Sequence, residues 1–325
     1  MAKDLSRWFA VVILSVHLIG CDQTLEPNAP FQKRLVVYAI LTNRTDTQFA
    51  RVYTSYPSEG DTPGVDSTRY GLLDASLTIR QGPNTYQFLD TLILADSVRG
   101  QPVWIKACVV HGLTPSERLP YDLVVSSPSL ETARSSLNYL APGHLTVANA
   151  ESLFLPLAVD TFPVAVTLSA DAAAYIVRFT IEYEAMTGGV WQPGRVEVPL
   201  DRETSVGTAP GNYVYPSLMA RGQLSDVALE GRGGVVFPGW AYRGVLSQLR
   251  SIYGGTNLRF RNAVFTLTQV NFALYAYYST ANAFFGAATL RLDEPDYSNI
   301  EGGLGVFGAI RDDADTLRLP QTLNF

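Results

Sequence analysis

Short apolar runs separated by turn residues recur along most of the chain. The stretch 75–82 (ASLTIRQG) shows the pattern, because Leu77 and Ile79 alternate with the polar residues Thr78 and Arg80. An alternation with a period of two is typical of a strand that buries one face. Short strands with turn residues about every dozen positions indicate a β-sandwich.

The second half of the chain continues this pattern. In the run 173–185, the apolar residues Tyr175, Val177, Phe179 and Ile181 alternate with other residues. The run 191–200 (WQPGRVEVPL) follows a Thr-Gly-Gly turn, so we expect it to return as the hairpin partner of the first run.

Only two segments have a pattern that suits helices, namely 242–253 and 271–285. The second begins at Asn271, a candidate N-cap, and repeats aromatic rings at steps of three residues. The sequence therefore predicts a mainly β protein with a two-domain β-sandwich architecture. We expect an immunoglobulin-like N-terminal module over 31–147 and a larger β-rich C-terminal module over 148–325, with one or two helices.

The start of the chain has the pattern of an export signal. Lys3 and Arg7 precede a largely apolar stretch of twelve residues, 8–19, which is too short for a permanent transmembrane helix and suits a secretory signal peptide. The stretch ends in Leu-Ile-Gly-Cys, which resembles the bacterial lipobox, whose cysteine receives diacylglycerol and an N-acyl chain. We expect a lipoprotein signal peptide over 1–20, lipid at Cys21 and a polar, Pro-containing tether over 21–30. The alternative is an ordinary signal peptide with a cysteine there by chance.

Lipidation at this position predicts a location in the cell envelope. Two or more acyl chains hold a protein stably on a bilayer, whereas one chain holds it only reversibly. We expect an outer-membrane lipoprotein. Asp22 resembles surface-export signals of some Bacteroidota lipoproteins, but the choice between the surface and the periplasmic face stays open.

Charge and cysteine content exclude several classes of function. The formal net charge is −6 and no basic patch stands out, so nucleic acid is not an expected partner. With Cys21 lipidated, Cys108 has no disulfide partner in the chain and lies among apolar neighbours, which predicts a buried strand residue. His111 is three positions away and is predicted to lie on the opposite face of that strand, so no Cys–His catalytic pair is expected.

Neither a metal site nor a catalytic motif emerges from the sequence. Two acidic clusters lack the spacing of calcium-binding loops and are expected in solvated turns; they are Asp293, Glu294 and Asp296, and Asp312, Asp313 and Asp315. Two histidines and one thiol suit zinc poorly. We expect no metal, no cofactor beyond the lipid at Cys21, and no enzymatic activity. A carboxylate pair for glycoside cleavage remains an open alternative, because its separation depends on the fold.

The segment 302–308 (GGLGVFG) contains the G-x-G-x-x-G pattern of dinucleotide-binding turns. Only seventeen residues follow Gly308, too few for the helix, second strand and acidic ribose ligand that such a turn requires. We therefore expect Gly303, Gly305 and Gly308 to allow a tight final strand or turn to pack close to another backbone.

Aromatic residues in Gly- and Pro-rich segments are the remaining candidates for a binding site. Tyr213, Tyr215 and Trp240 lie in such segments, as do Phe237 and Tyr242, where loops would expose the rings. Trp191 lies beside a turn and is a fourth candidate contact. Exposed rings stack on sugars or anchor a protein partner. The alternative is that these rings close the edge of a β-sandwich.

The order of these motifs resembles a known family. The segment 294–309 (EPDYSNIEGGLGVFGA) contains Ser-Asn-Ile followed by Gly-x-Gly-x-Phe-Gly, after a Tyr-x-Leu-x-Val segment at 121–125 and the first strand at 35–41. This order is similar to the Bacteroidota outer-membrane lipoproteins catalogued as domain of unknown function 4249. The resemblance implies a gene neighbourhood with TonB-dependent transporters. The expected function is thus binding of an unknown nutrient, or of such a transporter, during uptake; the alternative is a structural or adhesive envelope lipoprotein.

Overall fold

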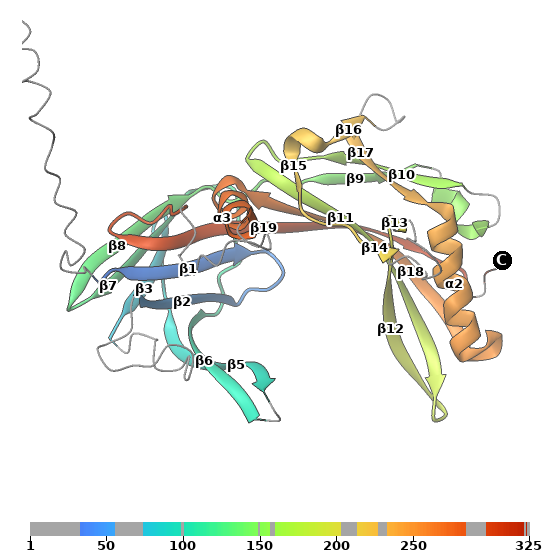
Figure 1. Cartoon of the computed structure of the whole chain (residues 1–325), viewed down its shortest axis with the longest axis horizontal. Coiled ribbons are helices and arrows are strands. Elements are labelled where there is room, and N and C mark those ends of the chain that lie inside the picture. The colour runs from blue at the N-terminus through green and yellow to red at the C-terminus, as the bar shows by residue number, and fades with distance from the viewer. Residues whose placement is uncertain are drawn as a thin grey trace, which may run out of the picture. The chain divides into compact units, whose positions relative to one another are not determined.

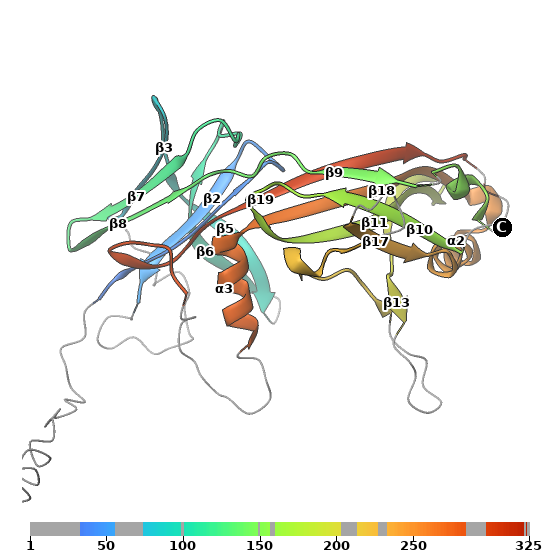
Figure 2. The same cartoon turned by 90° about the horizontal axis from the view of Figure 1, so that it is seen from above.

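The protein is mainly β in its computed structural model, which has several sheets and, in its described part, two α-helices (Figures 1 and 2). The structure describes residues 33–55, 74–98, 101–148, 150–156, 160–202, 213–226, 233–283, 297–321 and 323. Residues 34–325 form one compact unit. The predicted fold class is therefore confirmed as mainly β and β-sandwich-like.

A sheet of nine strands runs through the described chain. Its order is β12 (Val190–Val198), β11 (Ala172–Thr187), β18 (Leu258–Asn271), β19 (Gly303–Arg318), β1 (Leu35–Thr42), β2 (Gln48–Thr54), β6 (Gln101–Val110) and β5 (Leu89–Val98), with β15 (Met219–Ala220) paired to β11. Neighbouring strands on this path are antiparallel except β1 and β19, which are parallel.

Three smaller sheets and the helices accompany the large sheet. One sheet consists of β4 (Asn84–Gln87), β3 (Ser76–Gln81), β7 (Tyr121–Ser127) and β8 (Leu130–Leu137). Another consists of β16 (Ser225–Asp226), β17 (Gly233–Pro238), β10 (Thr161–Thr167) and β9 (His144–Val147), and β13 (Asp201–Arg202) pairs with β14 (Tyr213–Val214). The described residues form the α-helices α2 (Gly239–Tyr253) and α3 (Phe272–Ala283) and the 3-10 helices η1 (Ala150–Phe154), η3 (Arg221–Gln223) and η4 (Gly255–Asn257).

Among the described residues, two large hydrophobic cores and a smaller one next to α3 form because alternate residues of the strands are apolar. In the first core, β1, β2 and β6 face β3, β7 and β8, and Leu77 and Ile79 are fully buried as the alternation predicts. The second core lies between β11, β18, β10, β17 and α2. There Phe179 stacks on Phe265 with ring centroids 4.3 Å apart. Phe237 and Tyr242 are also fully buried in it, so the expectation that loops expose these two rings is wrong.

One strand, β19, belongs to both halves of the large sheet. Its residues from Gly303 to Ile310 pair with β1, and those from Ile310 to Arg318 pair with β18. Phe307 and Ala309 of this C-terminal strand are buried in the first core, beside Leu35 and Val37. The large sheet thus includes strands from both predicted modules, 31–147 and 148–325, whose boundary stays a prediction.

The glycine motif has an architectural role, as the sequence predicts. A Cβ on Gly303 would lie 2.8 Å from the Leu35 carbonyl oxygen. At Gly305 the backbone has φ +106°, and a Cβ there would overlap the backbone of Val37. Glycine at these positions therefore lets β19 pair closely with β1.

The helices confirm both predicted locations. α2 begins three residues before the predicted start, at Gly239. α3 follows Asn271, whose Oδ1 accepts hydrogen bonds from the backbone N–H of Leu274 at 3.2 Å and of Ala309 at 3.1 Å. The predicted N-cap is confirmed, and its side chain also holds the helix to β19.

Candidate functional site

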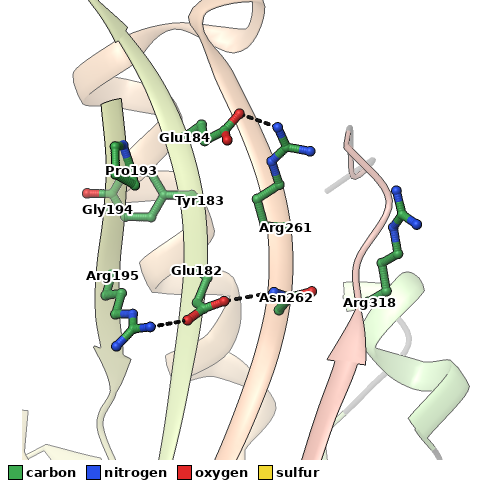
Figure 3. A pocket seen from close by; sticks show the side chains of 9 residues that line it. All are labelled: Glu182, Tyr183, Glu184, Pro193, Gly194, Arg195, Arg261, Asn262 and Arg318. Atoms are coloured by element: carbon green, nitrogen blue, oxygen red, sulfur yellow. Dashed lines mark hydrogen bonds and ion pairs between the residues drawn. The ribbon is translucent and has the colours of Figure 1, made fainter. Parts of the chain in front are cut away.

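A polar cleft of about 810 Å³ opens across β11, β12, β18 and the end of β19 (Figure 3). It is lined by charged residues from four strands, together with a tyrosine, a proline, a glycine and an asparagine. These residues are Glu182, Tyr183, Glu184, Pro193, Gly194, Arg195, Arg261, Asn262 and Arg318.

The strand alternation explains why the two glutamates face this cleft. Phe179 and Ile181 of β11 are fully buried in the second core, so Glu182 and Glu184 lie on the other face of the strand. On β18 the pairing shifts there, because Asn262 pairs with Glu182 whereas Phe260 pairs with Tyr183. The intervening residue, Arg261, has no opposite residue on β11, and this β-bulge presents it next to Asn262.

Hydrogen bonds and ion pairs hold the cleft side chains. Arg195 Nη2 lies 2.7 Å from Glu182 Oε1, and Asn262 Nδ2 donates to Glu182 Oε2 at 2.7 Å. Arg261 donates to Glu184. For Arg318, by contrast, the described residues supply no hydrogen bond or ion pair, and Figure 3 shows its guanidinium apart from these contacts. Within the described ranges, Arg318 is therefore a cleft cation without a partner that a ligand would have to displace.

Tyr183, which also lines the cleft, packs its ring towards α2. Its ring covers Gly194 on β12, where a Cβ would overlap the ring. Its ring centroid lies 5.9 Å from that of Tyr253 on α2. Burial, together with the hydrogen bond to Tyr253, raises the pKa of Tyr183 to about 12, so the phenol is neutral at physiological pH.

Trp191 lies beside the cleft, two residues before Pro193 on the same strand. The guanidinium carbon of Arg259 lies 3.9 Å from the centroid of the Trp191 ring, which is a close cation–π contact. Arg259 is two residues before Arg261 on β18. The predicted contact Trp191 is thus brought next to the charged residues.

Two of the other predicted rings form a separate surface. Tyr213 of β14 stacks on Trp240 of α2, with centroids 6.5 Å apart and planes at 21°. The Arg202 guanidinium lies 5.9 Å from the Tyr213 ring centroid. Tyr213 is 51% exposed and Trp240 is 40% exposed, and Tyr215 is exposed just after β14. The structure therefore brings Tyr213 and Trp240 together, whereas Trp191 packs against Arg259 instead.

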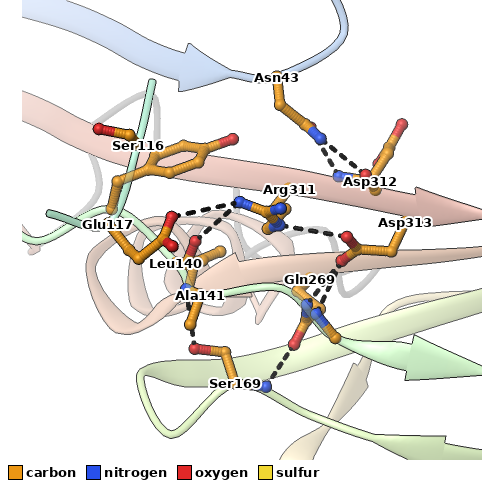
Figure 4. Close-up of polar contacts among 12 residues, drawn as sticks. Asn43, Ser116, Glu117, Leu140, Ala141, Ser169, Gln269, Arg311, Asp312 and Asp313 are labelled. Atoms are coloured by element: carbon orange, nitrogen blue, oxygen red, sulfur yellow. Dashed lines mark hydrogen bonds and ion pairs between the residues drawn. The ribbon is translucent and has the colours of Figure 1, made fainter. Parts of the chain in front are cut away.

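A polar network holds β19 to the segments that surround it (Figure 4). The Arg311 guanidinium lies 3.2 Å from Asp313, and Asp313 accepts hydrogen bonds from Gln269 and from the backbone N–H of Gly143. Asp312 pairs with Arg44. The expectation of solvated turns is wrong for this cluster, because Asp312, Asp313 and Asp315 all lie inside the strand β19.

Cys108 and His111 have separate partners. Cys108 is buried, and its thiol donates a weak hydrogen bond to Asp90 over 3.6 Å. Burial raises the pKa of Cys108 to about 11. His111 Nδ1 instead forms a 2.9 Å hydrogen bond with Thr47 Oγ1. The prediction of a buried strand cysteine is confirmed.

The described residues contain no cluster of three or more His, Cys, Asp or Glu side chains that would suit a metal ion. Within the same ranges, no helix has both the length and the apolar character needed to cross a membrane. Cys21 and the acidic cluster Asp293, Glu294 and Asp296 lie outside the described residues.

No family model matches the chain, and no curated protein matches it. The resemblance to the outer-membrane lipoprotein family therefore stays a prediction.

The charged cleft residues were not among the sequence candidates. Glu182 and Glu184 are a detectable signal, because they alternate with the apolar residues of the same strand and so must share its other face. The partners on β12 and β18 depend on strand register and on the bulge at Arg261, neither of which the sequence reveals.

Proposed function

We propose that this protein is a lipid-anchored accessory protein of the outer membrane, which binds a nutrient or a TonB-dependent transporter during uptake and catalyses no reaction. The observation that carries the proposal is the leader: two basic residues, an apolar stretch of twelve and a cysteine in a lipobox-like sequence. Cys21 is the lipid attachment site in this proposal, and whether the body faces the surface or the periplasm is left open.

The cleft supports a binding role. It holds three guanidinium groups and two carboxylates, although the whole chain has a net charge of −6. Both glutamates already accept charge-assisted hydrogen bonds, and Arg318 adds a guanidinium that has no such partner among the described residues. A planar guanidinium binds carboxylate or phosphate oxygens in a bidentate manner. The ligand that suits this cleft is therefore a polar molecule with an anionic group.

The chemistry of the candidate nucleophile also favours binding over catalysis. A reactive cysteine needs a thiolate, but burial raises the pKa of Cys108 to about 11 and its near neighbour His111 contacts Thr47. In the cleft, Tyr183 is a neutral phenol, and both glutamates are held by cationic or amide donors.

The exposed stack of Tyr213 and Trp240 supports the partner-binding part of the proposal. Rings that are half exposed and already ordered by stacking lose little entropy when they are covered. Arg202 beside them adds a positive charge. This surface suits a protein partner such as the transporter.

The experiment is a mild-detergent purification of the full-length lipidated protein from native envelopes, followed by identification of what accompanies it. We expect a TonB-dependent transporter to accompany the wild-type protein in stoichiometric amount. The Trp240→Ala variant should no longer retain it, whereas Val236→Ala, the matched control at an exposed position of β17, should. A solitary lipidated protein, together with unchanged nutrient uptake in cells that lack it, would contradict the proposal.

A structural or adhesive envelope lipoprotein is the second candidate. The observation that favours it is β19, which joins the two halves of the large sheet and would make the body a stiff spacer. The neighbouring genes separate the two candidates, because a transporter gene beside this one supports uptake and its absence supports the spacer.

A further inference from the structure

Helix α3 presents aromatic side chains without any charge of its own. Residues 262–283, which include all of α3, contain no Asp, Glu, Lys or Arg, in a chain of which 17% is charged. Figure 2 shows α3 standing out from the large sheet. Its residues Ala273 and Leu274 pack against Val306 of β19, and Tyr275 and Tyr277 are partly buried against the same cluster, whereas Phe272 and Tyr278 are exposed.

Rings from α3 and from the neighbouring strands form what we call the α3 aromatic surface. Its members are Tyr38, Tyr53, Phe272, Tyr277, Tyr278 and Tyr297. Tyr38 stacks on Tyr53 with centroids 5.7 Å apart, and its hydroxyl lies 2.8 Å from that of Tyr277. Tyr277 contacts Tyr278 at 5.8 Å. At the start of the helix, Phe272 meets Tyr297 edge to face at 6.2 Å.

Two of these rings are strongly exposed. Phe272 is 64% exposed and Tyr278 is 42% exposed, and Ser279 beside Tyr278 is exposed as well. By comparison, α2 carries Arg243 and Arg250. An uncharged helix that exposes rings is unusual for a surface in water, whereas rings with an apolar body and a polar edge are enriched where a bilayer meets water.

We propose that the α3 aromatic surface rests in the headgroup region of the lipid bilayer. This inference rests on the lipid anchor of the proposed function. Cys21 precedes Leu35, the first residue of β1, by fourteen positions, so the tether holds the start of β1 within about 50 Å of the anchor. Tyr38 lies on the same strand, three residues further on. Arg51, whose guanidinium is 5.8 Å from the Tyr53 ring centroid, adds a cation that suits lipid phosphates.

The test places a fluorescent probe on the surface. Full-length lipidated protein with Tyr278→Trp is reconstituted into vesicles of phosphatidylethanolamine and phosphatidylglycerol, with or without brominated acyl chains. The control is Ile252→Trp, at an exposed position of α2. We expect bromine to remove a larger share of the fluorescence of Tyr278→Trp than of the control or the wild type, and Phe272→Asp to abolish this difference.

The outcomes distinguish failure of the lipid anchor from failure of the membrane contact of the α3 aromatic surface. If the wild-type protein does not float with the vesicles, the lipid anchor fails, and the membrane contact fails with it. If the protein floats but Tyr278→Trp is quenched no more than the control, the anchor stands and the membrane contact is refuted. A photocrosslinker at position 278 that captures a protein instead of lipid in intact cells would likewise refute it.

Discussion

Single glycines on β19 decide how closely the C-terminal strand approaches β1. At Gly305 a side chain would meet two obstacles, namely the positive φ of +106° and the backbone of Val37. Gly112 has φ +75°, but a Cβ added there would have no atom within 4 Å, so this position isolates the first obstacle. The two positions together separate backbone strain from steric overlap.

We predict that Gly305→Ala lowers the free energy of unfolding by more than ~2 kcal/mol, whereas Gly112→Ala lowers it by about 1 kcal/mol. The larger effect follows because Gly305→Ala adds a clash with β1 to the conformational strain. Chemical denaturation of both variants checks this. Equal losses of unfolding free energy in the two variants would show that the close approach of Val37 is not the reason why position 305 requires glycine.

Cys108 predicts a pH dependence of stability. Its folded pKa of about 11 exceeds the ordinary value of 9.0, so the folded state keeps a proton that the unfolded state loses first. The stabilisation is complete below pH 9 and declines as the pH rises towards 11, by up to about 2–3 kcal/mol. Denaturation at pH 8 and pH 10 measures this decline in the free energy of unfolding. The Cys108→Ala protein should show a smaller decline. An equal decline in both proteins would contradict the assignment of this pH dependence to Cys108.

At the residue scale, the Gly- and Pro-rich composition of a segment predicts only in part whether its aromatic side chains are exposed. Tyr213, Tyr215 and Trp240 are exposed as expected, but Phe237 and Tyr242 of the same kind of segment are core residues. The difference arises because β17 leads directly into α2 at Pro238, and each element buries one face: Phe237 and Tyr242 lie on the buried faces, whereas Trp240 lies on the exposed face of α2. Local sequence does not record which side of such a junction faces the core.

At the scale of elements, Asn271 joins α3 to the sheet. Its Oδ1 accepts hydrogen bonds from an N–H in the first turn of the helix and from Ala309 of β19. We predict that Asn271→Ala lowers the free energy of unfolding by about 1–3 kcal/mol, because two buried donors lose their acceptor. Asn271→Asp keeps the acceptor oxygen and should lose less. Thermal melts of both variants measure the two losses of stability. Equal losses in Asn271→Ala and Asn271→Asp would contradict the role of the acceptor oxygen.

The sequence predicts most elements but not how they pair. Alternation locates β3 and β11, and the capping residue locates α3. The start of α2 escapes prediction because Pro238 serves as its N-cap, so the helix begins at Gly239, where helix propensity is poor. Strand register is set by contacts across the sheet, and the cleft residues therefore emerge only with the structure.

At the scale of the whole molecule, β19 couples the two cores. Phe307 is buried in the first core, and the strand continues beside β18, which contributes Phe265 to the second. We predict that residues 34–325 unfold in a single calorimetric transition. Phe307→Ala and Phe265→Ala should each lower its midpoint temperature, because each lowers the free energy of unfolding by about 3–5 kcal/mol. Phe49→Ala, at a half-exposed position of β2, should have little effect.

Two transitions, of which each core variant shifts only one, would contradict this coupling. The prediction depends on the pairing of β1 with β19, in which Leu35 lies opposite Gly303 although the two are 268 positions apart in the sequence. No local pattern in a sequence records a pairing over that distance, whereas mainly β character follows from short-range alternation alone. Fold class was therefore predictable and this connection was not.

The central claim is that lipid at Cys21 fixes this β-sandwich-like body to a membrane, where it binds a partner rather than turning over a substrate. The most direct measurement is mass spectrometry of the N-terminal peptide of the protein purified from its native envelope. The account predicts a chain that begins at Cys21 and carries the mass of a diacylglyceryl group and an N-acyl chain. An unmodified cysteine on a protein recovered from the medium or the cytosol would contradict it.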